Sequence, residues 1–385
     1  MSAAVIVAIV VASITTVVWG VVAWADAQPP DRLECLVDEW HVDRSDPQCI
    51  RINGLLRMQN FSTKSEVTAS HFEPHLRLLS DGSLDGIRTR IKHEDPNNPR
   101  DDNYWLAAVM MPQDSVPVKI GIELTGEGLD QLKSGWLRID FIQYGKKLRQ
   151  LKSEHIIFAL KEPVPVQESD WRERKGFLRL PIRTPLLTKQ DDLKAIVEQY
   201  VQPWAQPGDY LALAETALAI VQGNFRHPSA VQPQLLARTL CQFFPKKTSL
   251  QGPYSLQSLI DSSNGWRVTF ALIVGALGKA IGQGGWFYAL AGYQAPLIDD
   301  VTGSLPPYDQ FIVLGPLDPQ NTVDRLRAET GIETAIVDAN DLREVKILAA
   351  TQGINREFLA EALLDNPAGN ADEQTPIVLI RPKQV

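Results

Sequence analysis

The sequence "FIVLGPLDPQNTVDRLRAETGIETAIVDAND", residues 311–341, contains the clearest structural unit of this chain. Its first apolar run ends at Gly315, and Asp318 followed by a proline is typical of a helix N-cap and first turn. Gly331 ends that helix before a second apolar run. The pattern predicts a β-α-β crossover with two parallel strands. Ligands bind at the carboxyl ends of such strands, so Gly315 is a candidate for contact with a cofactor.

Three oxygen-bearing side chains, Asp338, Asn340 and Asp341, follow the second apolar run. Carboxylate and amide oxygens suit a hard divalent cation, and such a cation suits phosphate chemistry. Asp and Asn also favour turns without any ligand, and this explanation stays open. A second loop of this kind precedes the last apolar run and contains Asp365, Asn366, Asn370, Asp372 and Glu373. The two loops together favour a metal site.

Further carboxylates stand at predicted element boundaries. Asp191 and Asp192 fall in the first turn of a helix that Thr188 can cap, where acidic residues also suit the helix dipole. Glu215 stands where a short apolar strand becomes a helix. A carboxylate at such a junction either forms a salt bridge or faces a site. Both the structural and the functional explanation stay open for all three residues.

Residues 268–292 form an apolar stretch with Lys279 at its centre. Because a charge in the middle of a membrane is costly, the sequence favours a buried helix followed by a glycine-rich loop, and a re-entrant membrane segment is the alternative. Lys279 and the glycines around it can approach an anion closely. The pattern is not a Walker A loop, because Ala280 follows the lysine where that motif requires Ser or Thr.

Residues 3–25 carry no charged side chain and are long enough to cross a bilayer as a helix. They predict a single-pass membrane protein with an uncleaved anchor over residues 1–30 in contact with the lipid bilayer, and a cleaved signal peptide is the alternative. Residues 31–165 alternate apolar and polar side chains in short runs, which predicts a β-sandwich-like domain. Residues 166–177 are rich in charge and predict a linker. A mixed α/β domain is expected over residues 178–385.

The predicted fold class is therefore α+β: an N-terminal transmembrane helix, an all-β sandwich-like domain and a mixed α/β domain with the β-α-β crossover. The chain has 385 residues, of which 44% are hydrophobic, which suits about two domains. A net charge of −8 argues against nucleic acid as a partner and favours small molecules or proteins. Cys35, Cys49 and Cys241 are expected to be isolated thiols, with a Cys35–Cys49 disulfide as the alternative.

Several stretches together resemble the coenzyme F-420-0:gamma-glutamyl ligase family, particularly its bacterial, membrane-anchored branch. They occur in order over residues 178–385, and the resemblance does not extend to the β-rich N-terminal domain. The stretches are "PIRTPLLTKQDDL" (181–193), "PGDYLALAETALAIVQG" (207–223), "GALGKAIGQGGWFY" (275–288), "PPYDQFIVLGP" (306–316), "VDANDL" (337–342) and "DNPAGNADEQTPIVLIRP" (365–382).

The resemblance implies a GTP-dependent ligase that uses Mn²⁺ or Mg²⁺ to join L-glutamate to a small-molecule carboxylate acceptor. It implies that Asp338, Asp341 and Glu373 lie near the metal. The residues expected near the nucleotide or substrate are Asp191, Asp192, Glu215, Lys279 and Gly315. No catalytic residue is assigned. Nucleoside triphosphates are cytoplasmic, so this function favours the bulk of the chain on that side of the membrane.

Departures from the family pattern support an alternative function. Relatives commonly have Ser-Glu-Lys at the strand-to-helix junction, where this chain has Ala214-Glu215-Thr216 and lacks the lysine. The alternative is a non-catalytic, membrane-associated assembly or scaffold factor derived from the ligase fold. In that case the β-domain is expected to bind a protein partner. A homodimer stays open in both cases.

Overall fold

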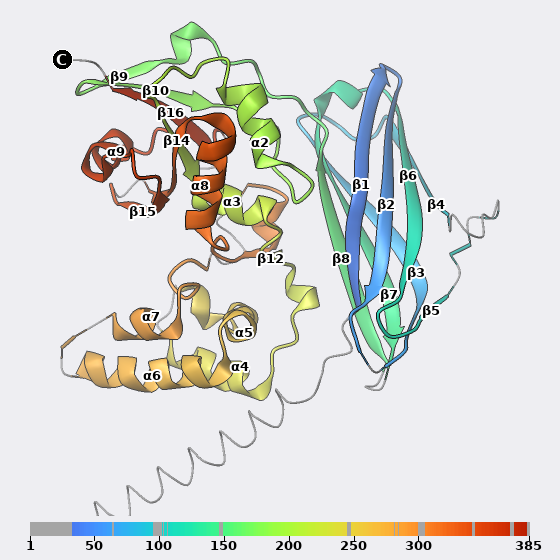
Figure 1. Ribbon diagram of the computed structural model, residues 1–385. Coiled ribbons are helices and arrows are strands. Elements are labelled where there is room, and N and C mark those ends of the chain that lie inside the picture. The colour runs from blue at the N-terminus through green and yellow to red at the C-terminus, as the bar shows by residue number, and fades with distance from the viewer. Residues whose placement is uncertain are drawn as a thin grey trace, which may run out of the picture.

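The computed structural model describes residues 33–382, except for 64, 95–101, 103, 106, 146–148, 245–247, 281, 284, 299–304, 341–342 and 370–372. A β-sandwich stands on one side of the molecule in Figure 1, beside a mixed α/β domain. A group of helices, α4 to α7, lies below the sheet of the α/β domain in the same view.

The N-terminal domain is a sandwich of two four-stranded antiparallel sheets with strand orders β1-β2-β6-β4 and β5-β3-β7-β8. In β2, Ile52 and Leu56 are buried between the sheets, whereas Arg51 is exposed, as expected when alternate side chains point to opposite faces. The predicted β-sandwich is confirmed. Its elements are β1 (Leu33–Asp46), β2 (Cys49–Asn60), β3 (Val67–Ser80), β4 (Ile87–Glu94), β5 (Ala108–Met110), β6 (Ser115–Gly126), η1 (Leu129–Gln131), β7 (Leu132–Tyr144) and β8 (Gln150–Ala159).

The C-terminal domain is built on a six-stranded sheet with the order β15-β14-β11-β16-β10-β9. Within this sheet β11 and β14 are parallel, and the other described pairs are antiparallel. Leu211 and Leu213 of β11 pack toward α2 and α8, while Ala212 packs toward α9. The strands are β9 (Arg172–Arg174), β10 (Phe177–Ile182), β11 (Tyr210–Ala214), β14 (Glu333–Ala339), β15 (Val345–Ala350) and β16 (Ile377–Pro382).

Helices cover both faces of this sheet and form the separate group beneath it. Those against the sheet are α2 (Leu193–Ile196), which continues as a π-helical turn η3 (Val197–Val201), α3 (Glu215–Val221), α8 (Pro319–Thr330) and α9 (Arg356–Leu363). The lower group contains α4 (Leu235–Leu240), α5 (Pro253–Ser262), α6 (Gly265–Ala280) and α7 (Trp286–Ala291). The short elements are η2 (Glu168–Asp170), β12 (Phe225–Arg226), η4 (Pro228–Ala230), η5 (Cys241–Phe243), η6 (Ser249–Gln251), η7 (Tyr308–Gln310) and β13 (Ile312–Val313).

An aromatic joint holds the two domains together. It is a buried cluster to which the sandwich contributes Trp136 and Ile157, and the α/β domain contributes Leu186, Ala219, Ile220, Tyr308, Phe311 and Val313. Two histidines adjoin it: the rings of His155 and His227 stack across the boundary with their centroids 4.4 Å apart. The joint fixes the sandwich against the loop that follows β10 and against the segment 308–313, which ends with β13.

The predicted β-α-β crossover between residues 311 and 341 is wrong in its first strand. α8 forms as expected, with Asp318 as its N-cap and Gly331 in the left-handed conformation at its end. However, β13 pairs with β12 in a separate two-stranded sheet, antiparallel. The parallel neighbour of β14 is β11, so the crossover runs from β11 to β14 and includes all of the lower helices.

Two local predictions also differ from the structure. The N-cap of α2 is Asp192, whose carboxylate accepts a hydrogen bond from the Lys194 amide at 3.2 Å, and not Thr188. The segment predicted as a linker, 166–177, contains η2 and the edge strand β9, which pairs with β10. Pairing with a neighbouring strand gives this charged segment a regular structure that its composition did not indicate.

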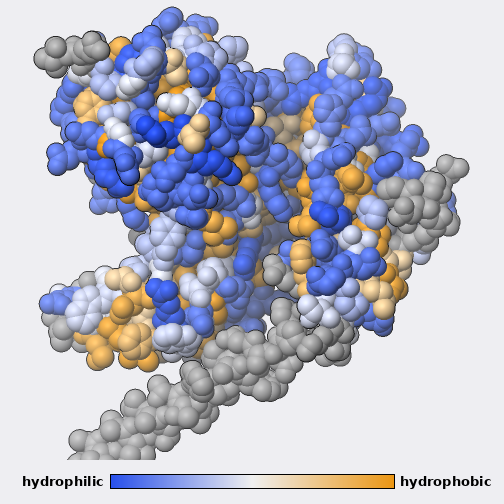
Figure 2. All heavy atoms as spheres, viewed as in Figure 1, coloured by the Kyte–Doolittle hydropathy of each residue, from blue (hydrophilic) through white to orange (hydrophobic). Residues whose placement is uncertain are grey.

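α6 is only half-buried, although a buried helix was predicted there. Val268 and Ala271 pack into the lower helical core. Trp266, Phe270 and Leu277 are exposed on the opposite side, and Figure 2 shows apolar side chains gathered over this helix. The helix is therefore covered on one face.

The predicted membrane segment is corrected as follows. The anchor expected over residues 1–30 lies outside the described residues. Among the residues that the structure describes, no helix is long and apolar enough to cross a membrane. The fold class is therefore α+β, a β-sandwich followed by an α/β domain. The described residues therefore do not support the transmembrane part of the predicted fold class or the predicted single-pass localisation.

The cysteines are free thiols, as the sequence favoured. In the β1–β2 hairpin Cys35 lies opposite Met58, whereas Cys49 lies opposite Asp46 beside the turn, so the register keeps the two cysteines apart. Burial raises the pKa of the Cys35 thiol well above its usual range. Cys35 is therefore a half-buried residue that packs against the sandwich core.

Candidate functional site

One edge of the six-stranded sheet collects four chain segments. β11 and β14 are parallel, so both carboxyl ends lie there. β16 is antiparallel to β11, and β10 is antiparallel to β16, so the start of β16 and the end of β10 lie at the same edge. This edge is where ligands bind in open sheets with parallel strands.

An apolar pocket of about 410 Å³ opens at this edge. Ala214 and Thr216 line it from the β11–α3 junction, and Ala339 lines it from the end of β14. Tyr308 is fully buried beside it and donates a hydrogen bond to the Leu187 carbonyl at 3.0 Å. The remaining walls of the pocket come from residues 184–187, 368–369 and 374–376 and from Ala217, Ile220 and Leu305. The pocket suits the uncharged body of a small molecule.

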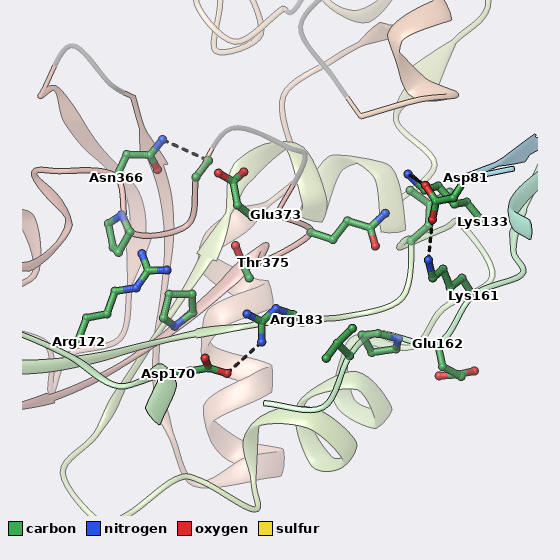
Figure 3. Close-up of a pocket in the computed structure, with 17 residues that line it drawn as sticks. Asp81, Lys133, Lys161, Glu162, Asp170, Arg172, Arg183, Asn366, Glu373 and Thr375 are labelled. Carbon is green, nitrogen blue, oxygen red and sulfur yellow. Dashed lines mark hydrogen bonds and ion pairs between the residues drawn. The ribbon is translucent and has the colours of Figure 1, made fainter. Parts of the chain in front are cut away.

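A charged cleft of about 600 Å³ adjoins the apolar pocket and lies between the two domains (Figure 3). The cleft and the pocket share four residues: Leu186, Gly369, Gln374 and Thr375. The sandwich contributes one wall with Asp81, Lys133, Lys161 and Glu162, and the α/β domain contributes the other with Asp170, Arg172, Arg183, Asn366 and Glu373. The two cavities thus form one continuous site, apolar at one end and charged at the other.

Ion pairs fix the side chains of the charged cleft. The carboxylate of Asp81 lies 2.5 Å from Lys133 Nζ and 2.6 Å from Lys161 Nζ, and these two ammonium groups lower the pKa of Asp81. Across the cleft, Arg183 Nη1 lies 3.0 Å from Asp170 Oδ2. A hydrogen bond from the Gln167 amide and the pair with Arg183 lower the pKa of Asp170. These carboxylates therefore stay charged and orient the cations beside them.

Three of the acidic residues predicted from the sequence lie at the same edge of the sheet. Glu215 is the first residue of α3, directly after β11. Asp338 is half-buried near the end of β14 and, by strand alternation, shares the face of Ile336 that packs against α2 and α8. Glu373 lines the charged cleft, and its carboxyl group lies over Gly369, where a Cβ atom would meet it.

Asp191 lines neither cavity and acts through the segment after β10. Its carboxylate accepts hydrogen bonds from the Thr188 amide at 2.6 Å and from the Thr188 hydroxyl at 2.9 Å. Burial raises the pKa of Asp191, and these hydrogen bonds oppose the rise. They hold the segment after β10, whose Leu187 carbonyl receives the bond from Tyr308. Asp192 is exposed and serves as the N-cap of α2.

The other predicted cofactor contacts lie away from both cavities. Lys279 is exposed in the last turn of α6, in the lower helical group. Gly315 is buried, and a Cβ atom there would lie 2.6 Å from Leu297. Its carbonyl accepts hydrogen bonds from Asn224 at 2.6 Å and from Gln294 at 3.0 Å. Gly315 therefore has a packing role in this structure, because β13 is not part of the six-stranded sheet.

The metal ligands stay a prediction. Asp341 lies outside the described residues. Within the described part of the chain, no group of three or more His, Cys, Asp or Glu side chains is arranged to hold a metal ion. Mg²⁺ is commonly bound by one or two carboxylates together with substrate phosphates. Glu215 and Asp338 carry donors of this type at the edge of the sheet, but neither is among the residues that line the two cavities.

Sequence reasoning did not identify Lys133, Lys161 or Arg183 as site residues. Each is a single cation with no motif around it. Lys133 lies at the start of β7 and Lys161 follows β8, both far in sequence from Arg183. The joint between the domains brings them to one cleft. No local sequence pattern indicates that these three cations lie in one cleft.

Three solved structures are similar to part of the chain. The GAE domain of GGA2p from Saccharomyces cerevisiae is 9% identical, with 34% of this chain and 94% of that chain covered and a TM-score of 0.21. A FixG-related protein from Vibrio parahaemolyticus is 11% identical, with 34% and 97% covered and a TM-score of 0.19. A protein from Archaeoglobus fulgidus is 11% identical, with 33% and 97% covered and a TM-score of 0.15. Structural similarity at these TM-scores supports no conclusion about the function of this chain. No curated protein matches the sequence.

Family models match both domains. Residues 35–162, the sandwich, match the N-terminal Ig-like domain of F420-0:gamma-glutamyl ligase. Residues 181–338, most of the α/β domain, match F420-0:gamma-glutamyl ligase itself. The resemblance found in the C-terminal sequence is confirmed, and it extends to the N-terminal domain, where the sequence analysis did not find it. This chain belongs to the F420-0:gamma-glutamyl ligase family.

Proposed function

We propose that this protein is a GTP- and divalent-cation-dependent ligase that joins L-glutamate to a small-molecule carboxylate acceptor at the carboxyl edge of β11 and β14. The observation that supports it best is the position of the apolar pocket, which opens between Ala214 and Ala339 where these two parallel strands end. Glu215 directly follows Ala214 as the first residue of α3, and Asp338 directly precedes Ala339 on β14. Membership of the ligase family supports the reaction class.

The chemistry follows from the poor reactivity of a carboxylate. Transfer of the terminal phosphoryl group of GTP to the acceptor carboxylate gives an acyl phosphate and GDP. The amine of L-glutamate then attacks the acyl carbon, the C–N bond forms, and phosphate leaves while the nitrogen loses a proton. A bound Mg²⁺ or Mn²⁺ supplies neutralisation of negative charge on the phosphate oxygens. Glu215 and Asp338 are the carboxylates that would hold it.

The apolar pocket has a separate task in this reaction. Its walls of leucine, alanine and proline side chains exclude water from the bound acceptor. Tyr308 stays neutral, because complete burial raises its pKa well above the ordinary value. Its hydrogen bond to Leu187 therefore persists at any physiological pH and keeps the wall of the pocket in place.

The test measures phosphate release from GTP by the full chain with F420-0 as acceptor. Release is expected only when L-glutamate, the acceptor and Mg²⁺ or Mn²⁺ are all present. Asp338→Asn and Glu215→Gln should each lower kcat by about 100-fold, the usual effect of removing one charged group that acts on a transition state. Asp324→Asn in α8 makes the same chemical change on an exposed helix face and should leave kcat unchanged. Wild-type turnover in both site variants would refute the proposal.

A non-catalytic scaffold role is the second candidate. The observation that favours it is Thr216 at the start of α3, where relatives commonly have lysine. In this case GTP with Mg²⁺ should not raise the melting temperature of the full chain, although any ligand that binds the folded state must raise it. A rise in the melting temperature that Asp338→Asn removes would exclude the scaffold role.

A further inference from the structure

We propose that the charged cleft is an anion-binding site completed by the Ig-like domain. In this site Lys133 and Lys161 receive a carboxylate or phosphate group of the molecule whose apolar part lies in the adjoining pocket. The Ig-like domain then takes part in substrate selection in addition to packing against the ligase domain. The identity of the ligand rests on the proposed function, whereas anion binding at the two lysines does not.

The first support is the charge balance on the sandwich wall. Lys133 lies at the start of β7 and Lys161 follows β8, and a hydrogen bond from the Leu160 amide to the Lys133 carbonyl at 2.8 Å joins these two strand ends. Both ammonium groups share the single carboxylate of Asp81. These three side chains together carry a net charge of +1, which favours an anion beside the lysines, while Glu162 on the same wall pairs with Arg44.

Asp81 also fixes where that charge lies. Its amide donates a hydrogen bond to the Gln131 carbonyl at 3.0 Å, which ties the turn after β3 to the segment before β7. The lysine side chains are 46% and 45% exposed, so their ammonium groups are accessible from the cleft. Figure 3 shows Asp81, Lys133 and Lys161 grouped on one side of the cleft.

The second support is the opposite wall. Arg183 is oriented by Asp170, and Arg172 is exposed on the edge strand β9. Two further carboxylates, Glu162 and Glu373, line the cleft. Glu162 pairs with two residues that do not line the cleft. Its Oε1 lies 3.2 Å from Arg44 Nη1, and its Oε2 accepts a hydrogen bond from the Tyr200 hydroxyl at 3.2 Å.

Glu373 extends from the α/β wall and lies between the two sides of the cleft in Figure 3. It disfavours an anion at its own position, so the negative group of the ligand is directed toward Lys133 and Lys161. An ammonium group of the same or a second ligand would be favoured near Glu373. The arrangement thus separates positions for opposite charges within one cleft.

The third support is continuity with the apolar pocket. The shared residues Leu186, Gly369, Gln374 and Thr375 border both cavities, so a single molecule can extend from one into the other. The apolar pocket holds no described lysine or arginine among its lining residues. A negative group on the ligand is therefore better stabilised in the cleft than in the pocket.

The test uses two anions, glutarate for a carboxylate and inorganic phosphate, titrated into the full chain by calorimetry without GTP or metal. Replacing both lysines, Lys133→Gln with Lys161→Gln, should weaken binding about tenfold for each lysine, because a hydrogen bond to a charged group contributes roughly that factor. Loss of glutarate binding alone assigns the site to a carboxylate, and loss of phosphate binding alone assigns it to a phosphate. Added salt should weaken binding to the wild type.

Two further variants make the test decisive. Asp81→Asn removes the competing carboxylate and should strengthen anion binding, a change that a purely structural role of Asp81 does not produce. Lys92→Gln with Lys119→Gln removes the same charge from the other sheet of the sandwich and should leave binding unchanged. The inference is overturned if wild type binds neither anion, or if the Lys133 and Lys161 variant binds both as tightly as wild type. If turnover is absent but anion binding follows this pattern, the proposed function fails and the anion site stands.

Discussion

The boundary between the two domains has two parts with opposite chemistry. At the aromatic joint, Trp136 is 6% exposed and its ring lies 5.3 Å from that of Phe311. At the charged cleft, Lys133 and Arg183 remain accessible and are held by single carboxylates. The joint excludes water and fixes the domains, whereas the cleft keeps space and charge for a ligand. The comparison indicates that packing at one end of the boundary pre-organises binding at the other.

The largest expected effect is loss of the joint. Trp136→Ala removes a buried ring and its hydrogen bond from Nε1 to His155 Nδ1 at 3.1 Å. It should lower the free energy of unfolding by about 4 kcal/mol, the range for a buried aromatic side chain. Urea denaturation followed by tryptophan fluorescence measures the change. Trp266→Ala, at a residue that is 53% exposed, is the matched control and should have a small effect. Equal effects of the two substitutions would show that the joint does not stabilise the protein.

The second effect is a dependence of the joint on pH. Burial, with the nearby His227 and Arg138, lowers the pKa of His155 from 6.5 to about 3. Between these values the unfolded chain binds a proton that the folded protein does not, so stability falls as the pH falls through this window. At pH 5 the loss is about 2 kcal/mol relative to neutral pH. His155→Gln does not titrate and should remove this loss, which urea denaturation at pH 7 and pH 5 measures.

Glu154 has the opposite dependence and serves as an internal check. Burial raises its pKa from 4.5 to about 7, so the folded state binds more protons than the unfolded chain in this window and stability falls as the pH rises. This contribution is present in both proteins and cancels when wild type is compared with His155→Gln. The exposed His41→Gln is the control. A pH dependence that is the same in wild type and His155→Gln would contradict the assignment.

The third prediction concerns the junction of β11 and α3, where Thr216 lines the apolar pocket. Thr216→Lys supplies the cation that the resemblance to the ligase family leads us to expect at this position, and a phosphate group placed there gains a charge-assisted hydrogen bond. The affinity for GTP with Mg²⁺ should rise about tenfold, as measured by titration calorimetry. Thr216→Gln has a similar length without the charge and should not raise it. Equal affinities of the two variants for GTP with Mg²⁺ would show that this junction does not contact the nucleotide.

The smallest expected effect on stability comes from the cleft itself. Arg183→Gln breaks the pair with Asp170, whose side chains are 35% and 28% exposed. Solvent screening limits the loss to about 1 kcal/mol or less in urea denaturation. The same variant should weaken the binding of glutarate or phosphate. A large loss of stability with unchanged anion binding would reverse the contrast between the joint and the cleft.

Local patterns in the sequence predicted much of the fold. Alternation in residues 50–58 predicted β2, Asp318 and Gly331 bounded α8, and Glu215 was placed at a strand-to-helix junction. These signals depend on strand periodicity and on capping within one helical turn. The predictions that failed concerned strand pairing. β13 does not belong to the main sheet, and the segment 166–177 contains the strand β9. Strand partners lie far apart in sequence, so local patterns do not identify them.

The site was predictable only in part. The edge with Glu215 and Asp338 followed from the rule that ligands bind where parallel strands end, although the partner of β14 was misassigned. Lys279 and Gly315 had suggestive neighbours in sequence and lie away from both cavities. Lys133 and Lys161 had no motif and line the cleft. Composition around a residue indicates its chemistry, and its position relative to another domain is independent of that composition.

The sequence alone predicted three features: a β-domain followed by an α/β domain, the bounds of single helices, and similarity to the ligase family in the C-terminal stretches. Those features arise from interactions between residues close in the chain, so a short window of sequence is enough to read them. Only the packing of the two domains places Lys161 and Arg183 in one cleft. The same packing brings Trp136 and Phe311 together in the joint. Burial of apolar surface drives that packing, and because it is non-directional, the sequence pattern of either domain does not specify which residues face each other.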